Sequence, residues 1–200
     1  MSAFGSLLEF RCALITGASS GLGLEYARQL APSVETLILV ARREKLLEEI
    51  ATDLVANFPH LRIKVFASDL VSDTRRDHLI NSLSQADLCP DLLINNAGMG
   101  DYGEFRSSDW SKTEKMIRLN IEALTHLAHA LLPGLLARQG AILNVSSLAS
   151  LLPIPDFAVY SATKSYVTSF SKALRLELSD QGVRVLAVCP GPVRTGFGEG

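Results

Sequence analysis

Short apolar runs alternate with longer amphipathic segments along almost the whole chain, and this alternation limits the fold more than any other feature. The apolar runs have the length and composition of β-strands and cover residues 12–15, 36–40, 61–67, 91–94, 140–145 and 183–188. Between them, apolar residues recur with the period of a helix over residues 22–30, 44–57, 74–86, 109–132 and 157–179. The helix over 109–132 is predicted to end before Pro133, because proline lacks a backbone N–H and crowds the preceding turn.

This order of strands and helices predicts an α/β fold, with a parallel sheet covered by helices on both faces. The predicted strands are almost continuously apolar, as parallel strands buried on both sides are. Right-handed crossovers then give a doubly wound, Rossmann-like sheet. No internal repeat or linker interrupts the 200 residues, so we expect one domain over residues 1–200. In such a sheet, ligands bind beyond the carboxyl ends of the strands.

The composition argues against several other classes of protein. With 48% hydrophobic and 20% charged residues, the chain is globular rather than disordered. Its net charge of -2 gives no reason to expect nucleic acid as a partner. No apolar run reaches the ~18 residues of a membrane span. Cys12, Cys89 and Cys189 show neither metal-ligand spacing nor a disulfide pattern, so we expect no metal site and a reducing, cytoplasmic location.

A glycine-rich turn follows the first predicted strand, over residues 16–23. Such a turn lets the backbone approach a pyrophosphate, whose charge is favourable at the amino terminus of the next helix. The spacing of Gly17, Gly21 and Gly23 differs from the common dinucleotide-binding fingerprint. A tight structural turn is therefore the alternative, although the strand before and the helix after it favour nucleotide binding.

Two arginines, Arg42 and Arg43, follow the second predicted strand. An acidic residue there would bind the ribose 2′-hydroxyl of NAD, and none is present. The planar guanidinium of Arg42 can instead pair with a 2′-phosphate, which favours NADP(H) over NAD(H). Arg43 is interpreted as a solvated charge at the start of a helix, and a surface arginine is also the alternative for Arg42.

Polar residues also follow the third and fourth predicted strands. Asp69 follows the third, where its carboxylate can accept a hydrogen bond from an adenine amino group or cap the next helix. Asn95 and Asn96 end the fourth, and buried amides need hydrogen-bond partners. They are predicted either to link neighbouring strands or to line the ribose of a nucleotide.

Further along the chain, Asn120 lies in the middle of a predicted helix although asparagine has a poor helix propensity. Its amide indicates a local kink or a held water, and an exposed helical position is the alternative. Ser146 or Ser147, after the fifth strand, can cap the following segment. Residues 190–195, after the sixth, form a rigid turn whose backbone and Thr195 hydroxyl can contact a nicotinamide carboxamide.

Tyr160 and Lys164 lie one turn apart in the last predicted helix and therefore share a face. A free phenol has a pKa of about 10. A neighbouring ammonium favours the phenolate, so Lys164 is expected to lower the pKa of Tyr160 and to make it a proton donor and acceptor near neutral pH. Such pairs also occur by chance on many helices, so the assignment depends on the rest of the chain.

With these residues assembled, the chain resembles the short-chain dehydrogenase/reductase family. The matching pieces, in the family's order and spacing, are residues 16–23, Asp69, 95–98, Asn120, Ser147, 160–164 and 190–195. The resemblance implies an oxidoreductase that transfers a hydride between a nicotinamide and a carbonyl or alcohol substrate. It also implies that the chain forms a homodimer or homotetramer.

The resemblance assigns roles to a catalytic tetrad of Asn120, Ser147, Tyr160 and Lys164. It implies that Tyr160 donates a proton to the substrate carbonyl oxygen while Ser147 hydrogen-bonds the same oxygen. Lys164 would hold the nicotinamide ribose, and Asn120 would hold a water. The expected cofactor-binding residues are Gly17, Ser19, Ser20, Gly21, Leu22, Gly23, Arg42, Asp69, Leu70, Asn96, Ala97, Gly98, Tyr160, Lys164, Pro190, Gly191, Val193 and Thr195.

The sequence departs from the family pattern after the turn at 190–195. Family members usually continue with a substrate-covering helical segment, a further helix and a seventh strand, whereas this sequence stops at Gly200. We therefore expect a domain without the last strand and the substrate lid, with the sixth strand as an exposed edge. A truncated module that binds the cofactor or a partner protein without turnover is the alternative. Residues 99–105 and 151–155 are expected to border the substrate pocket and favour an apolar substrate.

Overall fold

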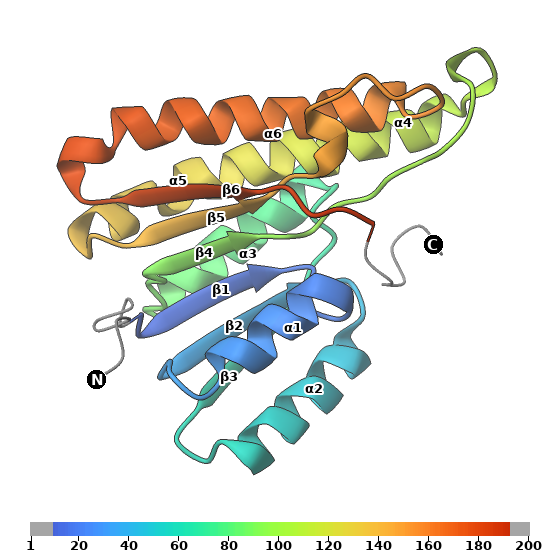
Figure 1. Cartoon of the computed structure of the whole chain (residues 1–200). Helices are drawn as coiled ribbons and strands as arrows, with labels where there is room; N and C mark the ends of the chain where they lie inside the picture. Colours follow the sequence, from blue (N-terminus) through green and yellow to red (C-terminus); the bar gives the residue numbers. More distant parts are fainter. Residues whose placement is uncertain (1–9, 193–200) are drawn as a thin grey trace, which may run out of the picture.

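Six parallel strands form one sheet in the computed structural model, which describes residues 10–192 (Figure 1). Their order across the sheet is β3-β2-β1-β4-β5-β6. Each neighbouring pair is parallel. The strands are β1 (Cys12–Thr16), β2 (Thr36–Ala41), β3 (Arg62–Ala67), β4 (Leu92–Asn95), β5 (Ala141–Val145) and β6 (Arg184–Val188). This order confirms the predicted doubly wound, Rossmann-like α/β fold, in which the chain reverses direction across the sheet between β1 and β4.

Helices cover both faces of the sheet (Figure 1). The first face carries α1 (Gly21–Leu30) and α2 (Glu44–Asn57). The second carries α3 (Asp73–Gln85), α4 (Trp110–Ile117), α5 (Leu124–Ala137) and α6 (Ala158–Glu177). A π-helical turn, η2 (Arg118–Ala123), joins α4 to α5. Short 3-10 turns lie at η1 (Phe105–Ser107), η3 (Leu148–Ser150) and η4 (Ser179–Gln181).

The central strands divide their side chains between two apolar cores, one on each face. Ala13 and Ile15 of β1 pack with residues of α1 and α2. Leu14, between them in sequence, packs on the other side with residues of α3 and α5. Successive side chains of a strand point to opposite faces, so a strand that is buried on both sides must be apolar throughout.

The segment predicted as one helix over 109–132 differs from the prediction in two ways. It consists of α4, the π-helical turn η2 and α5. Pro133 does not end it, because α5 continues to Ala137 with Pro133 inside. Leu135 is fully buried, and Leu131, Leu132 and Leu136 pack against the same core. Burial of these leucines offsets the one backbone hydrogen bond that proline removes.

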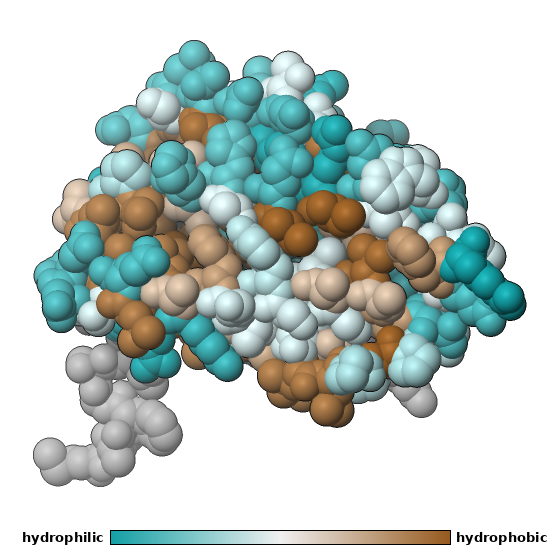
Figure 2. Space-filling view, turned by 90° about the horizontal axis from the view of Figure 1, so that it is seen from above, coloured by the Kyte–Doolittle hydropathy of each residue, from teal (hydrophilic) through white to brown (hydrophobic). Residues whose placement is uncertain are grey.

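The strand β6 lies at an edge of the sheet, as predicted, and Leu186 in it is 51% exposed. Seen from above the view of Figure 1, apolar patches alternate with hydrophilic surface (Figure 2). Among residues 10–192, no helix combines the length and the apolar character needed to cross a bilayer.

Candidate active site

The glycine-rich turn between β1 and α1 has the backbone geometry that the sequence predicted. Gly17 and Gly21 adopt φ angles of +66° and +54°, in the left-handed region that favours glycine. A Cβ at Gly23 would collide with the carbonyl oxygen of Gly17 and the amide of Asn96. Only glycine lets the start of α1 pack this closely on the turn.

The asparagines at the end of β4 link neighbouring parts of the sheet. Asn95 Nδ2 donates to Asn144 Oδ1 of β5 at 2.9 Å. Asn96 Nδ2 donates to the carbonyl oxygen of Thr16 at 2.9 Å. The Thr16 hydroxyl in turn accepts from the backbone N–H groups of Asn96 and Ala97, at 3.0 and 2.9 Å. Of the two predicted roles, linking strands is therefore the one that the structure shows.

Arg43, not Arg42, contacts the glycine-rich turn. Its Nη2 donates to the hydroxyls of Ser19 at 3.0 Å and Ser20 at 3.1 Å. Arg43 is an exposed residue at the start of α2, as interpreted, and its guanidinium also reaches back to the turn after β1. The hydroxyls at positions 19 and 20 were the sequence signal for this contact.

Asp69 remains an exposed carboxylate beyond β3, and the backbone N–H of Val71 donates to its Oδ1 at 3.1 Å. It does not cap α3, since that role belongs to Ser72, whose hydroxyl accepts from the N–H of Arg75. The capping alternative for Asp69 is thus wrong. Leu70, beside it, is buried.

Tyr160 and Lys164 lie on the buried face of α6, at 8% and 4% exposure. The ammonium nitrogen of Lys164 is 5.8 Å from the centroid of the Tyr160 ring. It donates to the carbonyl oxygen of Val145, at the end of β5, at 2.9 Å. A Cβ on Gly98 would lie 3.4 Å from the same nitrogen. The i, i+4 spacing therefore brings both side chains to the carboxyl ends of β4 and β5.

Burial dominates the titration of both groups. It lowers the pKa of Lys164 from 10.5 to about 8. It raises the pKa of Tyr160 above 10, against a hydrogen bond with the Ser147 side chain that lowers it. The direction for Tyr160 is opposite to our prediction, because loss of water around the phenol outweighs the favourable contacts of its ionised form.

The two serines after β5 point to opposite sides, as the period of a strand requires. Ser146 faces α6, where its hydroxyl donates to the carbonyl oxygen of Lys164 at 2.9 Å. Ser147 is the one that hydrogen-bonds Tyr160. Its hydroxyl also caps η3 by accepting from the N–H of Ala149 at 3.1 Å. Ser146 is therefore structural, and Ser147 reaches the phenol.

Asn120 lies inside the π-helical turn η2 and is 1% exposed, so the helix is locally irregular there and the exposed alternative is wrong. The held water stays a prediction. Its Nδ2 donates to the carbonyl oxygen of Met99 at 2.8 Å and to the Thr163 hydroxyl at 3.0 Å. Its Oδ1 accepts from the N–H of Met99 at 3.0 Å. A Cβ on Gly98 would lie 3.3 Å from that oxygen. Asn120 thus joins Lys164 beside Gly98.

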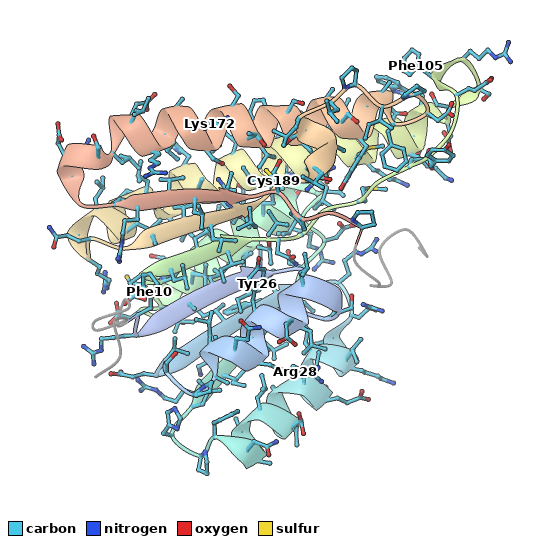
Figure 3. All side chains as sticks on the ribbon, viewed as in Figure 1. Phe10, Tyr26, Arg28, Phe105, Lys172 and Cys189 are labelled. Carbon is cyan, nitrogen blue, oxygen red and sulfur yellow. The ribbon has the colours of Figure 1, made fainter. Side chains whose placement is uncertain are left out.

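The end of β6 contributes the remaining predicted residues. Figure 3 shows Cys189 just after β6 and Phe10 just before β1, so the two labels mark opposite ends of the sheet. The carbonyl oxygen of Pro190 accepts from the N–H of Leu148 at 3.0 Å. Gly191 lies against the same leucine. Val193 and Thr195 lie outside the described residues.

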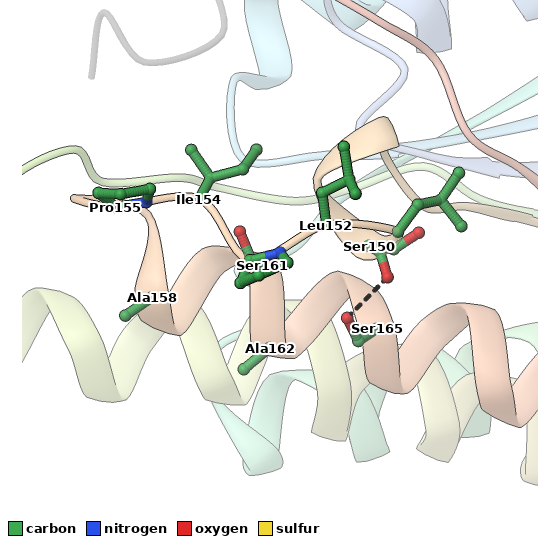
Figure 4. Close-up of a pocket in the computed structure, with 10 residues that line it drawn as sticks. Ser150, Leu152, Ile154, Pro155, Ala158, Ser161, Ala162 and Ser165 are labelled. Atoms are coloured by element: carbon green, nitrogen blue, oxygen red, sulfur yellow. Dashed lines mark hydrogen bonds between the residues drawn. The ribbon is translucent and has the colours of Figure 1, made fainter.

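A groove of about 780 Å³ lies between residues 150–155 and α6 (Figure 4). Ala158, Ser161, Ala162 and Ser165 line its helical side. The Ser165 hydroxyl donates to the carbonyl oxygen of Ser150 at 2.9 Å. These helical residues do not share the face of α6 that carries Tyr160 and Lys164, so the groove is separate from the tetrad. The prediction that 151–155 border the substrate pocket stays a prediction.

Comparison with known proteins agrees with this geometry. The family model described as short chain dehydrogenase matches residues 11–199. The chain therefore belongs to the short-chain dehydrogenase family. A solved short-chain dehydrogenase from Sphingobium yanoikuyae in complex with NADPH superposes with a TM-score of 0.88 at 36% identity, over 94% of this chain and 73% of the other.

Other members of the short-chain dehydrogenase family differ in what their names say they reduce. L-sorbose reductase from Gluconobacter frateurii, complexed with NADPH and L-sorbose, has a TM-score of 0.87 at 32% identity, with 94% of this chain and 72% of that one covered. Very-long-chain 3-oxoacyl-CoA reductase from Rattus norvegicus is 33% identical over 92% of this chain. The match spans 59% of that relative's length. The names of these relatives thus point to different substrates, a sugar in one case and an acyl-CoA in the other.

Proposed function

We propose that this protein is an NADP(H)-dependent oxidoreductase of carbonyl or alcohol substrates, with Tyr160 as the general acid and base. The observation that carries the proposal is the convergence of Tyr160, Lys164, Ser147 and Asn120 at the carboxyl ends of β4 and β5. This is where a doubly wound sheet binds its ligands.

The residues present fit a dinucleotide. The left-handed glycines and the close contact of Gly23 with Gly17 bring the glycine-rich turn against the amino terminus of α1, where a pyrophosphate is favoured. Gly98 keeps the space beside Lys164 Nζ and Asn120 Oδ1 free of a side chain, since a Cβ there would lie 3.4 Å and 3.3 Å from those atoms. The predicted binding residues that follow β3, β4 and β6 lie at the carboxyl ends of these parallel strands, which form one edge of the sheet. When bound, the cofactor supplies the hydride.

A preference for NADP(H) is supported by the arginine at the glycine-rich turn. Arg43 is already held over Ser19 and Ser20 and presents a planar guanidinium there. A 2′-phosphate is the ligand that such a fork binds best. Arg42, the residue favoured from the sequence, remains the second candidate. Several structural neighbours are complexed with NADPH or NADP, in agreement with this preference.

Proton transfer is the task of Tyr160. Its raised pKa keeps the phenol protonated at neutral pH, which suits a donor to a carbonyl oxygen that gains negative charge. The Ser147 hydroxyl, hydrogen-bonded to the phenol, lies beside the same oxygen and can donate to it. Lys164, with a pKa of about 8, is largely protonated at neutral pH and favours the phenolate that remains after the proton leaves. Asn120 fixes residues 98–99 next to the ammonium.

The test measures binding and turnover separately. Titration with NADPH and with NADH should show tighter binding of NADPH. Oxidation of NADPH should then be followed with a panel of ketones and aldehydes that carry apolar substituents. Tight NADPH binding with turnover of at least one carbonyl supports the proposal. Binding without turnover of any would favour the cofactor-binding module, and tighter binding of NADH would contradict the preference for NADP(H).

A further inference from the structure

Arg76 on α3 is the bulkiest of the fully buried side chains among residues 10–192, with 2% of its surface exposed. Nothing in the proposed chemistry uses it. Removing a guanidinium from water carries a large free-energy cost, and the ion pairs it gains seldom exceed that cost. Its Nε also finds no hydrogen-bond partner within the described part of the chain. A residue buried at such a cost needs an explanation other than net stability.

One end of the guanidinium holds the segment between β3 and α3. Nη1 donates to the carbonyl oxygen of Leu70 at 2.7 Å and to that of Val71 at 3.2 Å. These residues directly follow Asp69, the carboxylate proposed for the adenine ring. The backbone of this segment is thus held by the Arg76 charge in addition to its own turn, in which the N–H of Ser72 donates to the carbonyl oxygen of Asp69 at 3.1 Å.

The other end of the guanidinium reaches the element that carries Asn120. Nη2 donates to Glu122 Oε1 at 2.6 Å and to Asp73 Oδ1 at 2.7 Å. Glu122 and Asn120 belong to the same π-helical turn η2. The two carboxylate side chains are 47% and 62% exposed, so water solvates them even without the arginine.

We propose that Arg76 is a positioning residue for the adenine end of the cofactor, which fixes residues 70–71 and ties them to the turn that presents Asn120. This inference rests on the proposed function and on the predicted contact between Asp69 and the adenine amino group. Loss of Arg76 is expected to loosen the adenine end and to leave the Tyr160 end in place, because Asn120 keeps its hydrogen bonds to Met99 and Thr163.

The test uses two halves of the cofactor as probes. Arg76→Met keeps the unbranched, apolar part of the side chain and removes the charge, while its former carboxylate partners stay solvated. The variant should bind 2′,5′-ADP about tenfold more weakly, because charged hydrogen bonds to the segment are lost. Its affinity for reduced nicotinamide mononucleotide should change by less than about twofold. A purely structural role would lower the midpoint of unfolding and leave the two affinities in their original ratio.

Two further variants complete the design. Arg118→Met is the matched control, because Arg118 lies in the π-helical turn η2 with Glu122. Its guanidinium contacts Asp73 at 3.6 Å and Glu114 at 3.1 Å. We expect this variant to bind 2′,5′-ADP as tightly as the parent. Glu122→Gln removes charge at a half-exposed site and should fold even if Arg76→Met does not. It should weaken 2′,5′-ADP binding about threefold, because Arg76 keeps only Asp73 as an ionic partner.

Unchanged 2′,5′-ADP affinity in the Arg76 variant, or in Glu122→Gln if that is the one that folds, would overturn the inference while leaving the proposed function intact. Failure of the unaltered protein to bind 2′,5′-ADP and NADPH would instead contradict the proposed function and the inference together.

Discussion

Replacing Lys164 by methionine should make the protein more stable near neutral pH although it removes a residue proposed for catalysis. The pKa of Lys164 is about 8 in the folded chain, against 10.5 for an ordinary lysine, because the ammonium is buried. Since one pH unit corresponds to about 1.4 kcal/mol, the buried charge costs about 3 kcal/mol. Loss of the hydrogen bond to Val145 costs about 1 kcal/mol, so the free energy of unfolding should rise by about 2 kcal/mol in total.

The pH dependence of this gain follows from proton linkage. Between pH 8 and 10.5 the unfolded lysine holds a proton that the folded one has released, so the unfolding free energy of the unaltered protein rises with pH through this window. The advantage of Lys164→Met is therefore complete below about pH 8 and disappears at about pH 10, where the linkage contribution no longer exceeds the ~1 kcal/mol of the lost hydrogen bond. Urea unfolding of the cofactor-free protein at about pH 7 and about pH 10 measures it.

Lys172→Met, at an exposed position on the same helix, is the control and should change stability little at either pH. A Lys164→Met protein that is less stable than the parent at pH 7, or one whose advantage is the same at pH 10, would refute the reasoning. In either case the ammonium would have to be better solvated than its burial indicates.

Two further substitutions test other parts of the site. Arg43→Ala should raise the KM for NADPH about tenfold and the KM for NADH less than threefold. A larger increase in the KM for NADPH from Arg42→Ala would indicate that Arg42 binds the 2′-phosphate instead. Ser147→Ala should lower kcat by about 10²–10³-fold. Ser146→Ala should instead reduce the free energy of unfolding by about 1–2 kcal/mol, since its buried hydroxyl donates to the backbone of α6. Equal kinetic effects of the two serines would contradict their opposite orientations.

Much of the fold could be predicted from the sequence, because the burial of a strand is reflected in the residues of that strand itself. The strands β1, β2 and β4 are buried on both sides, as their uninterrupted apolar runs predicted. A kink or a held water was predicted at Asn120 for a similar reason, since asparagine has a poor helix propensity, and the residue lies in a π-helical turn. These features depend on the residue and its immediate neighbours.

The features that the sequence did not reveal depend on contacts between distant elements. The local chemistry of Pro133 predicts the end of a helix. The helix continues because the leucines around Pro133 pack in a core formed with other parts of the chain. Arg43 and Arg42 are adjacent in sequence. Which of them reaches Ser19 depends on how the start of α2 lies relative to the turn after β1. The pKa of Tyr160 was predicted from a neighbouring charge, whereas the loss of water around it dominates.

The central claim is that the Tyr160 phenol supplies the proton when a carbonyl is reduced at the edge of this sheet. The most direct measurement compares Tyr160→Phe with the parent by fluorescence titration with NADPH and by single-turnover oxidation of NADPH with an accepted carbonyl substrate. The account predicts NADPH affinity within about threefold of the parent and a hydride-transfer rate lowered by at least about 10³-fold. A variant that binds NADPH equally well and retains most of the rate would contradict it.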